Sequence, residues 1–138
     1  MTPFDTRVAL LIRDDLMVWQ KLNVAAFLAT GIAGAAPEAM GAEPYRDAAG
    51  REHARLLAQP MLIFAADTAQ LAHAWRVALE RDLTRAVYVE AMFASTHDEA
   101  NREVFLAEDP EAPHFVGLAL RGPRKGIEKA TKGLRLHP

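Results

Sequence analysis

Four short apolar runs, separated by helical patterns and polar loops, constrain the fold of this chain more than any other feature. They span residues 7–14, 60–66, 84–92 and 114–120. An unbroken apolar run of this length, bounded by charge, is typical of a strand that is buried on both faces. Strands that alternate with helices need crossover connections. The pattern therefore predicts an α/β fold with a partly parallel sheet and helices on both of its faces.

Residues 17–35 are predicted to form the first helix, and this segment is apolar on every side. Trp19 and Leu22 recur at helical spacing, while Val24 and Leu28 make the opposite side apolar too. A helix that is apolar all round is buried all round. We therefore expect this helix to contact both the sheet and a second subunit in a homodimer.

Pairs of polar residues mark where two further helices begin. Asp67 and Gln70 form a capping box before one of them, and Thr96 and Glu99 form another before a short helix near residues 97–107. Such a pair satisfies backbone N–H groups that the first helical turn leaves without partners.

The remaining segments predict a hairpin and a C-terminal helix. Residues 43–53 favour two short strands joined by a turn centred on residues 47–50. The last helix is predicted to start at Gly122 and Pro123, because proline is favoured in a first helical turn, and to stop at Gly133.

Length and cysteine content bound the class of protein. A chain of 138 residues builds one core, which predicts a single domain over residues 1–138. The absence of cysteine excludes disulfides, thiolate metal ligands and a cysteine nucleophile, and favours the cytosol. Residues 1–5 lack the features of a signal peptide, and the longest apolar stretch, 24–36, is shorter than the roughly 20 residues of a membrane span. We therefore expect a soluble cytoplasmic protein with no membrane association.

The sequence motifs of common cofactor and metal sites are absent. The chain has no glycine-rich phosphate-binding motif, no HExxH and no GxSxG. No two of its five histidines stand at the spacing of a metal site. We therefore expect neither a metal nor a cofactor.

Polar side chains follow the first and third predicted strands, at the end of the strand where ligands gather in open α/β sheets. They are Asp14, Asp15, Gln20, Lys21 and Asn23 after the first strand, and Glu90, Thr96, His97 and Asn101 after the third. We expect the two groups to lie side by side and to line one hollow. The candidate catalytic residues are Lys21, Asn23, Glu90 and His97. Together they would polarise a carbonyl or position a water, while the others bind the ligand.

Lys21 is the most informative of these residues, because it enters an apolar helix with part of its stem desolvated. Glu90 or Asp14 is the carboxylate that we expect to pair with it. The same residues also have structural interpretations. Lys21 could extend to solvent from the first helical turn, Glu90 could end a strand, and His97 could begin a helix.

The C-terminal end of the chain is basic, although the net charge of the whole chain is −2. On a helix, Lys125, Lys129 and Lys132 would share one face, which favours an anionic partner such as a nucleotide or RNA. The alternative is a solvated helix whose cations stabilise its own C-terminal dipole. No aromatic residue alternates with these lysines, so a base would have no stacking platform.

Both ends of the chain resemble a known family. Residues 11–26, which include RDDL and QKLNVAA, resemble the opening of type II peptidyl-tRNA hydrolases, where a strand ending in R-(N/D)-D-L leads to K-x-K-V-A-A-Q. Residues 116–136, with the turn at Gly122-Pro123, resemble the last strand and final helix of that family. The stretch RDDLMVWQKLNVAAFLATGI is also similar to the bacterial family called domain of unknown function 2000, which is related to those hydrolases in fold.

The resemblance implies a three-layer α/β/α domain, a mixed sheet of four or five strands and a homodimer. At three positions in the first helix the chain departs from the hydrolases. Asn23, Phe27 and Thr30 stand where that family has lysine, glutamine and histidine. The D-A-G-x-T motif after the third strand is missing as well, so peptidyl-tRNA is not the substrate we expect.

Two hypotheses for the function follow. The first is a small hydrolase that acts on an ester or amide carbonyl. The second is a non-catalytic dimeric module that binds a small anionic ligand, a nucleotide or RNA.

Overall fold

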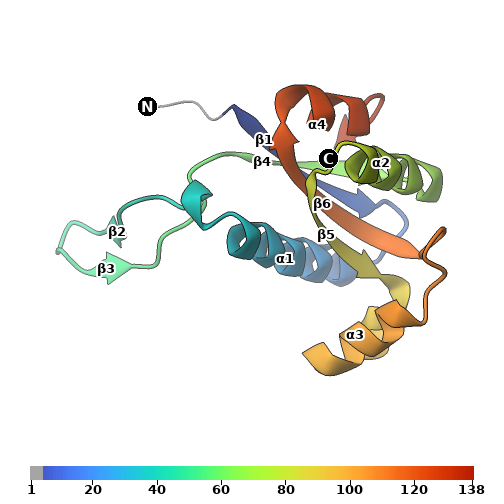
Figure 1. The fold of residues 1–138 in the computed structure, drawn as a ribbon. Coiled ribbons are helices and arrows are strands. Elements are labelled where there is room, and N and C mark those ends of the chain that lie inside the picture. Colours follow the sequence, from blue (N-terminus) through green and yellow to red (C-terminus); the bar gives the residue numbers. More distant parts are fainter. Residues whose placement is uncertain (1–4) are drawn as a thin grey trace.

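The computed structural model describes residues 5–138, so the polar N-terminal residues 1–4, on which the signal-peptide prediction partly depends, lie outside the described part (Figure 1). Its elements in chain order are β1 (Thr6–Arg13), α1 (Val18–Ala35), the short 3-10 helix η1 (Pro37–Ala39), β2 (Tyr45–Arg46), β3 (Glu52–His53), β4 (Met61–Ala66), α2 (Thr68–Glu80), β5 (Thr84–Val89), the 3-10 helix η2 (Glu90–Ala94), α3 (Asp98–Leu106), β6 (Phe115–Pro123), α4 (Arg124–Ala130) and β7 (Arg135–Leu136).

The main sheet is mixed and has five strands in the order β5-β6-β1-β4-β7. The four predicted apolar runs are confirmed as β1, β4, β5 and β6. β1 and β4 are parallel, and β6 runs antiparallel to both β1 and β5. The carboxyl ends of β1, β4 and β5 therefore point to one end of the sheet. The sequence pattern missed β7, which pairs with β4 only through Leu136 opposite Phe64 and Arg135 opposite Ala65.

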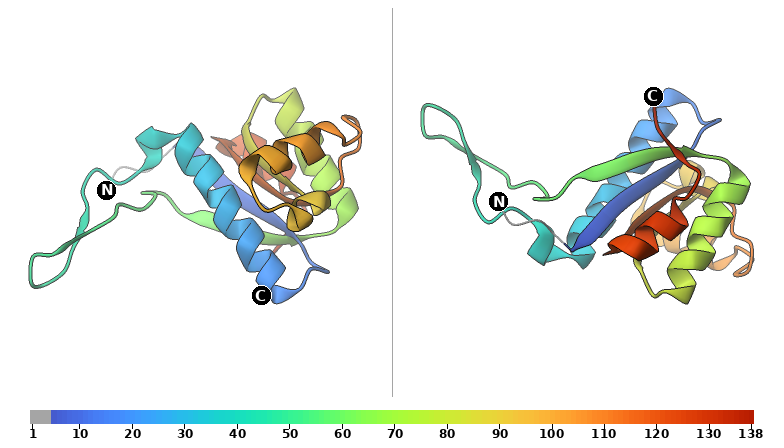
Figure 2. Two further views of the ribbon diagram at one scale, coloured as in Figure 1. Left: turned by 90° about the horizontal axis from the view of Figure 1, so that it is seen from below. Right: turned by 90° about the horizontal axis from the view of Figure 1, so that it is seen from above.

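Helices cover both faces of this sheet, which gives three layers (Figure 2). Val8, Leu10 and Ile12 of β1 pack toward α1, while Ala9 and Leu11 pack toward α2 and α4. The alternation follows from the period of two in a strand, which sends successive side chains to opposite faces. β1 is apolar on both sides because it lies in the middle of the sheet and is covered twice.

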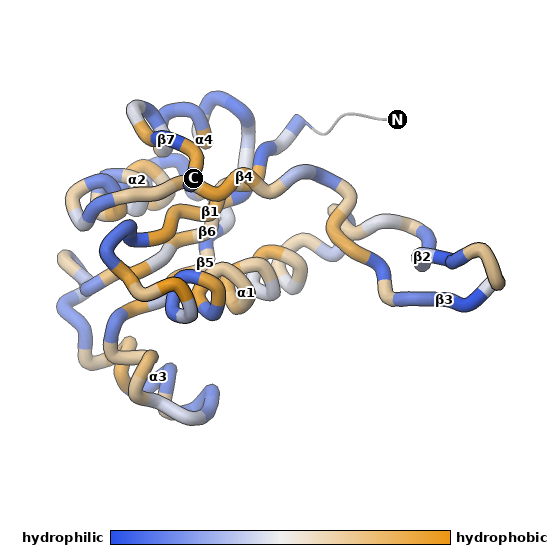
Figure 3. The backbone as a smooth tube through the Cα atoms, turned by 180° about the vertical axis from the view of Figure 1, so that it is seen from behind, coloured by the Kyte–Doolittle hydropathy of each residue, from blue (hydrophilic) through white to orange (hydrophobic). Residues whose placement is uncertain are grey.

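The prediction that α1 is buried all round is wrong for the chain by itself. The buried residues of α1 are Val24, Leu28 and Ile32, a single strip at four-residue spacing that faces the sheet. Residues on its opposite side are exposed, with Leu22 at 66%. The colouring of α1 in Figure 3 shows that most of its residues are apolar. One sheet face can cover only one side of a helix, so residues on the far side of α1, such as Leu22, stay exposed in the described chain.

Four predicted boundaries differ in the structure. The capping box of Asp67 and Gln70 is confirmed, but α3 is capped by His97 and not by Thr96. The third strand ends at Val89, because the chain turns there into η2. β6 continues through the Gly-Pro pair, and α4 ends at Ala130. Lys132 therefore lies in the turn before β7 and does not continue a helical face.

The predicted hairpin is confirmed as a two-stranded arm that extends away from the body of the molecule (Figures 1 and 2). Asp47 organises its turn: its carboxylate accepts from the backbone N–H of Ala49 and Arg51 and from the side chain of Arg51. These hydrogen bonds, led by the one from the Arg51 backbone, lower the pKa of Asp47. Gly50, at φ +84°, completes the turn in a conformation that glycine adopts without strain.

No helix in the described part of the chain is long and apolar enough to cross a bilayer.

Candidate functional site

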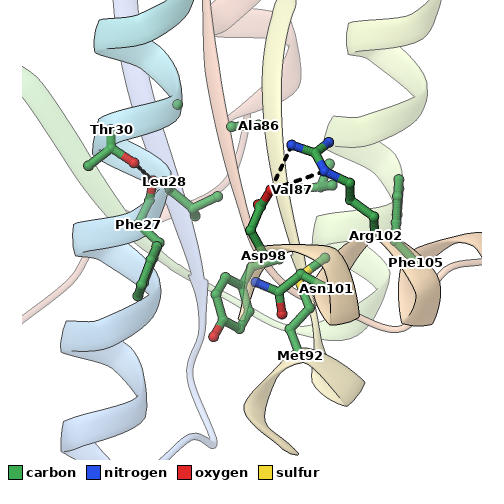
Figure 4. A pocket seen from close by; sticks show the side chains of 12 residues that line it. Phe27, Leu28, Thr30, Ala86, Val87, Met92, Asp98, Asn101, Arg102 and Phe105 are labelled. Atoms are coloured by element: carbon green, nitrogen blue, oxygen red, sulfur yellow. Dashed lines mark hydrogen bonds and ion pairs between the residues drawn. The ribbon is translucent and has the colours of Figure 1, made fainter. Parts of the chain in front are cut away.

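A groove lies between α1 and α3, alongside the edge strand β5. It consists of two adjoining hollows of about 280 Å³ and about 450 Å³ that share the side chains of Phe27, Tyr88, Met92, Asp98 and Asn101. Figure 4 shows one of them, with Phe27 and Leu28 on α1 facing Asn101, Arg102 and Phe105 across β5. We call these hollows together the α1–α3 groove. It lies near the end of the sheet where β1, β4 and β5 terminate.

Aromatic side chains line the groove in an unbroken series. The ring centroids of Trp19 and Phe93 are 5.9 Å apart, those of Phe93 and Tyr88 are 5.3 Å apart, and those of Tyr88 and Phe27 are 6.3 Å apart. Trp19 and Phe27 are each 57% exposed, so they present ring surface to the groove that the protein itself does not cover. Exposed rings of this kind are suited to a planar apolar ligand.

Tyr88 supplies the polar group at the floor of this series. Its hydroxyl accepts a hydrogen bond of 3.2 Å from the side-chain amide of Asn23. Burial raises the pKa of Tyr88, and the hydrogen bond from Asn23 lowers it by less, so the phenol stays protonated. Because the oxygen accepts from Asn23, the phenolic hydrogen remains free to donate to a ligand.

His97 and Asn101 contribute polar groups from α3. The Nδ1 atom of His97 accepts from the backbone N–H of Ala100 at 3.1 Å, so in the neutral ring the proton is on Nε2. The Oδ1 atom of Asn101 accepts a short hydrogen bond from the hydroxyl of Ser95. This leaves the amide N–H₂ of Asn101 available on the groove side. His97 therefore caps α3 through Nδ1 and can donate a hydrogen bond through Nε2–H. Because Nε2 carries the proton, it cannot accept one as a general base.

Four of the predicted site residues meet in this groove: Asn23, Thr96, His97 and Asn101. The ends of β1 and β5 lie side by side, as predicted, since the Nη2 atom of Arg13 lies 3.5 Å from the carboxylate of Glu90. Glu90 itself does not line the groove, and Asp15 forms an ion pair of 2.6 Å with Arg13. Burial lowers the pKa of Arg13, but Asp15 and Glu90 outweigh this effect and raise it.

Lys21 does not lie in the α1–α3 groove, which corrects the expectation of one common hollow. It lines a separate hollow of about 390 Å³ with Asp14 and the C-terminal residues 135–138. Its Nζ atom lies 3.1 Å from Nε2 of His137, so its partner is neither Glu90 nor Asp14. The physical reason is helical geometry: residues two apart on a helix point in nearly opposite directions, so Lys21 and Asn23 face different sides of α1.

The other predicted binding residues lie elsewhere. The side chain of Gln20 accepts from the backbone N–H of Met17 at the start of α1, which is a structural role. Lys125 and Lys129 are exposed on α4, which covers the opposite face of the sheet from α1 (Figure 1). They therefore cannot contribute to the α1–α3 groove.

The sequence interpretation missed Tyr88 and the aromatic residues around it. The available signal was a tyrosine among the alanine and valine residues of 86–89, because a buried phenol needs a hydrogen-bond partner. Trp19 and Phe27 were assigned to buried helix surface, and their exposure could not be known without the position of α3.

Comparison with known proteins places the chain in a family whose function is not established. Residues 6–138 match the family model described as "Protein of unknown function (DUF2000)". A solved structure of a protein of unknown function, Atu0240 from Agrobacterium tumefaciens strain C58, matches with a TM-score of 0.94 and 48% sequence identity, and covers 99% of this chain and 100% of that one. No curated protein matches the chain. The chain therefore belongs to the DUF2000 family.

Proposed function

We propose that the α1–α3 groove binds a small neutral organic ligand with a planar apolar body and a carbonyl group. The observation that carries this proposal is the series of aromatic rings from Trp19 to Phe27, with the protonated phenol of Tyr88 within it. The rings match a flat apolar ligand, and the phenol matches a hydrogen-bond acceptor on it.

The charge of the lining argues for a neutral ligand. The groove contains one carboxylate, Asp98, and that carboxylate is paired with Arg102 at 2.8 Å. The unused polar groups include three uncharged donors: the hydroxyl of Tyr88, the amide of Asn101 and the Nε2–H of His97. Donors of this kind match a carbonyl oxygen, whereas a charged ligand would lose its hydration without gaining a counter-charge.

Hydrolysis of an ester or amide carbonyl is the second candidate function. The donors that bind a carbonyl oxygen would also stabilise negative charge on it. The hydroxyl of Ser95, however, is hydrogen bonded to Asn101 and to the backbone oxygen of Met92, and the acceptor nitrogen of His97 is used as a helix cap. Neither arrangement pairs a nucleophile with a base, so we place ligand binding first.

The test uses benzamide as a probe that combines an aromatic ring with a neutral carbonyl. Binding is followed by NMR of the indole N–H groups, because the chain has two tryptophans and they report different sites. Trp19 lines the groove, while Trp75 packs against Phe115 on the other face of the sheet at 5.2 Å. We expect benzamide to shift the Trp19 signal and to leave that of Trp75 unchanged.

The variants test which groups recognise the probe. Tyr88→Phe is expected to weaken benzamide binding by about three- to tenfold, which corresponds to one neutral hydrogen bond. Tyr45→Phe, in the distant hairpin, is the matched control and should have no effect. Equal affinity for toluene, or no response of Trp19 to benzamide, would contradict carbonyl recognition. Consumption of phenyl acetate that is lost in Tyr88→Phe would instead support hydrolysis.

We also propose that the chain forms a homodimer through the exposed side of α1. That side carries Val18, Leu22 and Ala26, and no charged residue occurs between Leu22 and Ala35. A continuous exposed apolar face of this kind is unusual on a monomer.

Three further proposals depend on the sequence and its family resemblance. A relation in fold to type II peptidyl-tRNA hydrolases is supported by the order of apolar runs and by the motifs at both ends of the chain. Binding of an anion, a nucleotide or RNA by α4 is supported by the exposed Lys125 and Lys129. A cytosolic location is supported by the absence of cysteine.

A further inference from the structure

We infer that a second binding site, independent of the α1–α3 groove, lies on the other side of α1 and takes a small organic carboxylate. It is the hollow of about 390 Å³ lined by Asp14, Lys21, Ala65, Arg135, Leu136, His137 and Pro138. We call it the Lys21 hollow. Nothing in the proposed function uses these residues.

The fold places this hollow at the carboxyl ends of two parallel neighbours. Asp14 follows β1 directly, and Ala65 lies near the end of β4. The backbone N–H of Asp14 donates to Ala66, and that of His137 donates to Ile63, so both flanking segments are fixed to the sheet. Figure 2 shows the C-terminal end of the chain beside the start of α1. The end of parallel strands is where α/β sheets bind ligands.

The charged side chains of the Lys21 hollow form no ion pair with one another. Among the described residues, the guanidinium of Arg135 and the carboxylate of Asp14 have no hydrogen bond or ion pair, and the ammonium of Lys21 contacts only His137. Neither cation is ion-paired with Asp14, and two cationic side chains against one carboxylate side chain in the same hollow favour an anion.

His137 holds Lys21 in place as a neutral ring. Its Nδ1 atom lies 3.0 Å from the backbone oxygen of Pro138, which can only accept, so Nδ1 carries the proton. Its Nε2 atom then accepts from the ammonium of Lys21 at 3.1 Å. One of the three ammonium hydrogens is used in this way, and the other two remain for a ligand.

Asp14 narrows the class of ligand. Its carboxylate would repel a dianion such as a phosphate monoester, but it would accept a hydrogen bond from a hydroxyl or amino group next to a carboxylate. Lys21 and Arg135 would hold the carboxylate, with the planar guanidinium well matched to its two oxygens. The arrangement therefore points to a hydroxy- or amino-carboxylate.

The experiment measures binding of lactate, alanine, propionate and inorganic phosphate to the whole chain by calorimetry. We expect lactate or alanine to bind more tightly than propionate, and propionate more tightly than phosphate. Lys21→Met and Arg135→Met should each weaken carboxylate binding by at least about tenfold, the usual loss for a charge-assisted hydrogen bond. Arg76→Met, at an exposed position of α2, is the matched control and should have no effect.

Asp14→Asn separates the two parts of the proposal. It should abolish the preference for lactate or alanine over propionate while carboxylate binding itself persists. Thermal melts of each variant establish that it is folded. Tighter binding of phosphate than of any carboxylate would overturn the proposal, as would affinities that do not change in both Lys21→Met and Arg135→Met. The benzamide experiment tests other residues with another ligand, so either proposal can be contradicted while the other stands.

Discussion

Tyr88 lies where the edge strand β5 meets α1, with 7% of its surface exposed and its hydroxyl bonded to Asn23. A phenol in this position can donate to a ligand only while it is protonated. Burial raises its pKa, which keeps it protonated well into the alkaline range. The same shift has a consequence for stability, because the unfolded chain has the ordinary tyrosine pKa of about 10.

The first prediction concerns this titration. Since the folded pKa of Tyr88 is raised, its contribution to stability is fully present below the unfolded pKa and is lost as the pH rises through the folded one. The chain has two tyrosines, so tyrosinate absorbance can be assigned with single variants. Tyr88→Phe should remove the transition with a midpoint above about 10, and Tyr45→Phe should leave it. A transition that survives in Tyr88→Phe would contradict the assignment.

Lys21 and Asn23 show what residue-level reasoning could have established. Both follow the first strand and are therefore predicted to line one catalytic hollow, yet a helix turns side chains two apart to nearly opposite sides. Their separation was therefore available from the predicted helix alone. Their partners were not: Tyr88 and His137 are 65 and 116 positions away along the chain.

At the scale of elements, the contact between α1 and β6 depends on a glycine. A Cβ at Gly117 would overlap Cγ1 of Val24 and come within 3.0 Å of Cδ1 of Leu28. The buried strip of α1 can therefore lie directly on the strand. The apolar pattern predicted the helix and the strand, but the need for a glycine between them arises only when they are packed together.

The second prediction follows from this contact. Gly117→Ala should lower the free energy of unfolding by about 1–3 kcal/mol, the usual cost of overpacking a core. Gly34→Ala is a matched control, since nothing lies within 4 Å of a Cβ there. Gly34 is the next-to-last residue of α1, so that change should stabilise the protein by at most about 0.5–1 kcal/mol, the value for a helix interior. Urea unfolding measures both. Equal effects of the two substitutions would show that Gly117 is not a packing contact.

The third prediction concerns the start of α3. His97 accepts from the backbone N–H of Ala100, so His97→Ala should destabilise α3 by about 1 kcal/mol, while His97→Asn should restore the cap. Amide exchange within Asp98–Leu106 measures the effect on this helix. If His97→Asn behaves like His97→Ala, the ring has a role beyond capping. The sequence pattern predicts a helix cap here but assigns it to Thr96. The pattern cannot distinguish Thr96 from its neighbour His97, because both side chains can accept a hydrogen bond from the backbone.

At the scale of the whole molecule, two features extend beyond the core. The exposed side of α1 is apolar, and the β2–β3 arm projects into solvent (Figure 2). An isolated two-stranded hairpin is marginally stable in water. A second copy of the chain that packed against both features would cover the apolar side of α1 and support the arm. This is the homodimer proposed above.

The fourth prediction tests that homodimer. Leu22→Glu places a charge on the exposed side of α1 and should convert a dimer into a monomer in analytical ultracentrifugation. Leu106→Glu is the matched control, because Leu106 is an equally apolar residue that is 85% exposed on α3 and not on α1. It should leave the molecular mass unchanged. A wild-type chain that is monomeric at every concentration would contradict the proposal.

The sequence by itself determined the elements of this protein. Runs of apolar residues with a period of two or of 3.6 reflect local geometry, so β1, β4, β5, β6 and the long helices were readable from neighbouring residues. Only the tertiary structure decided which side chains meet. The order of strands in the sheet places Tyr88 beside Asn23 and His137 beside Lys21, and it exposes one side of α1. These contacts join residues far apart in the chain, and no local pattern records how distant elements pack.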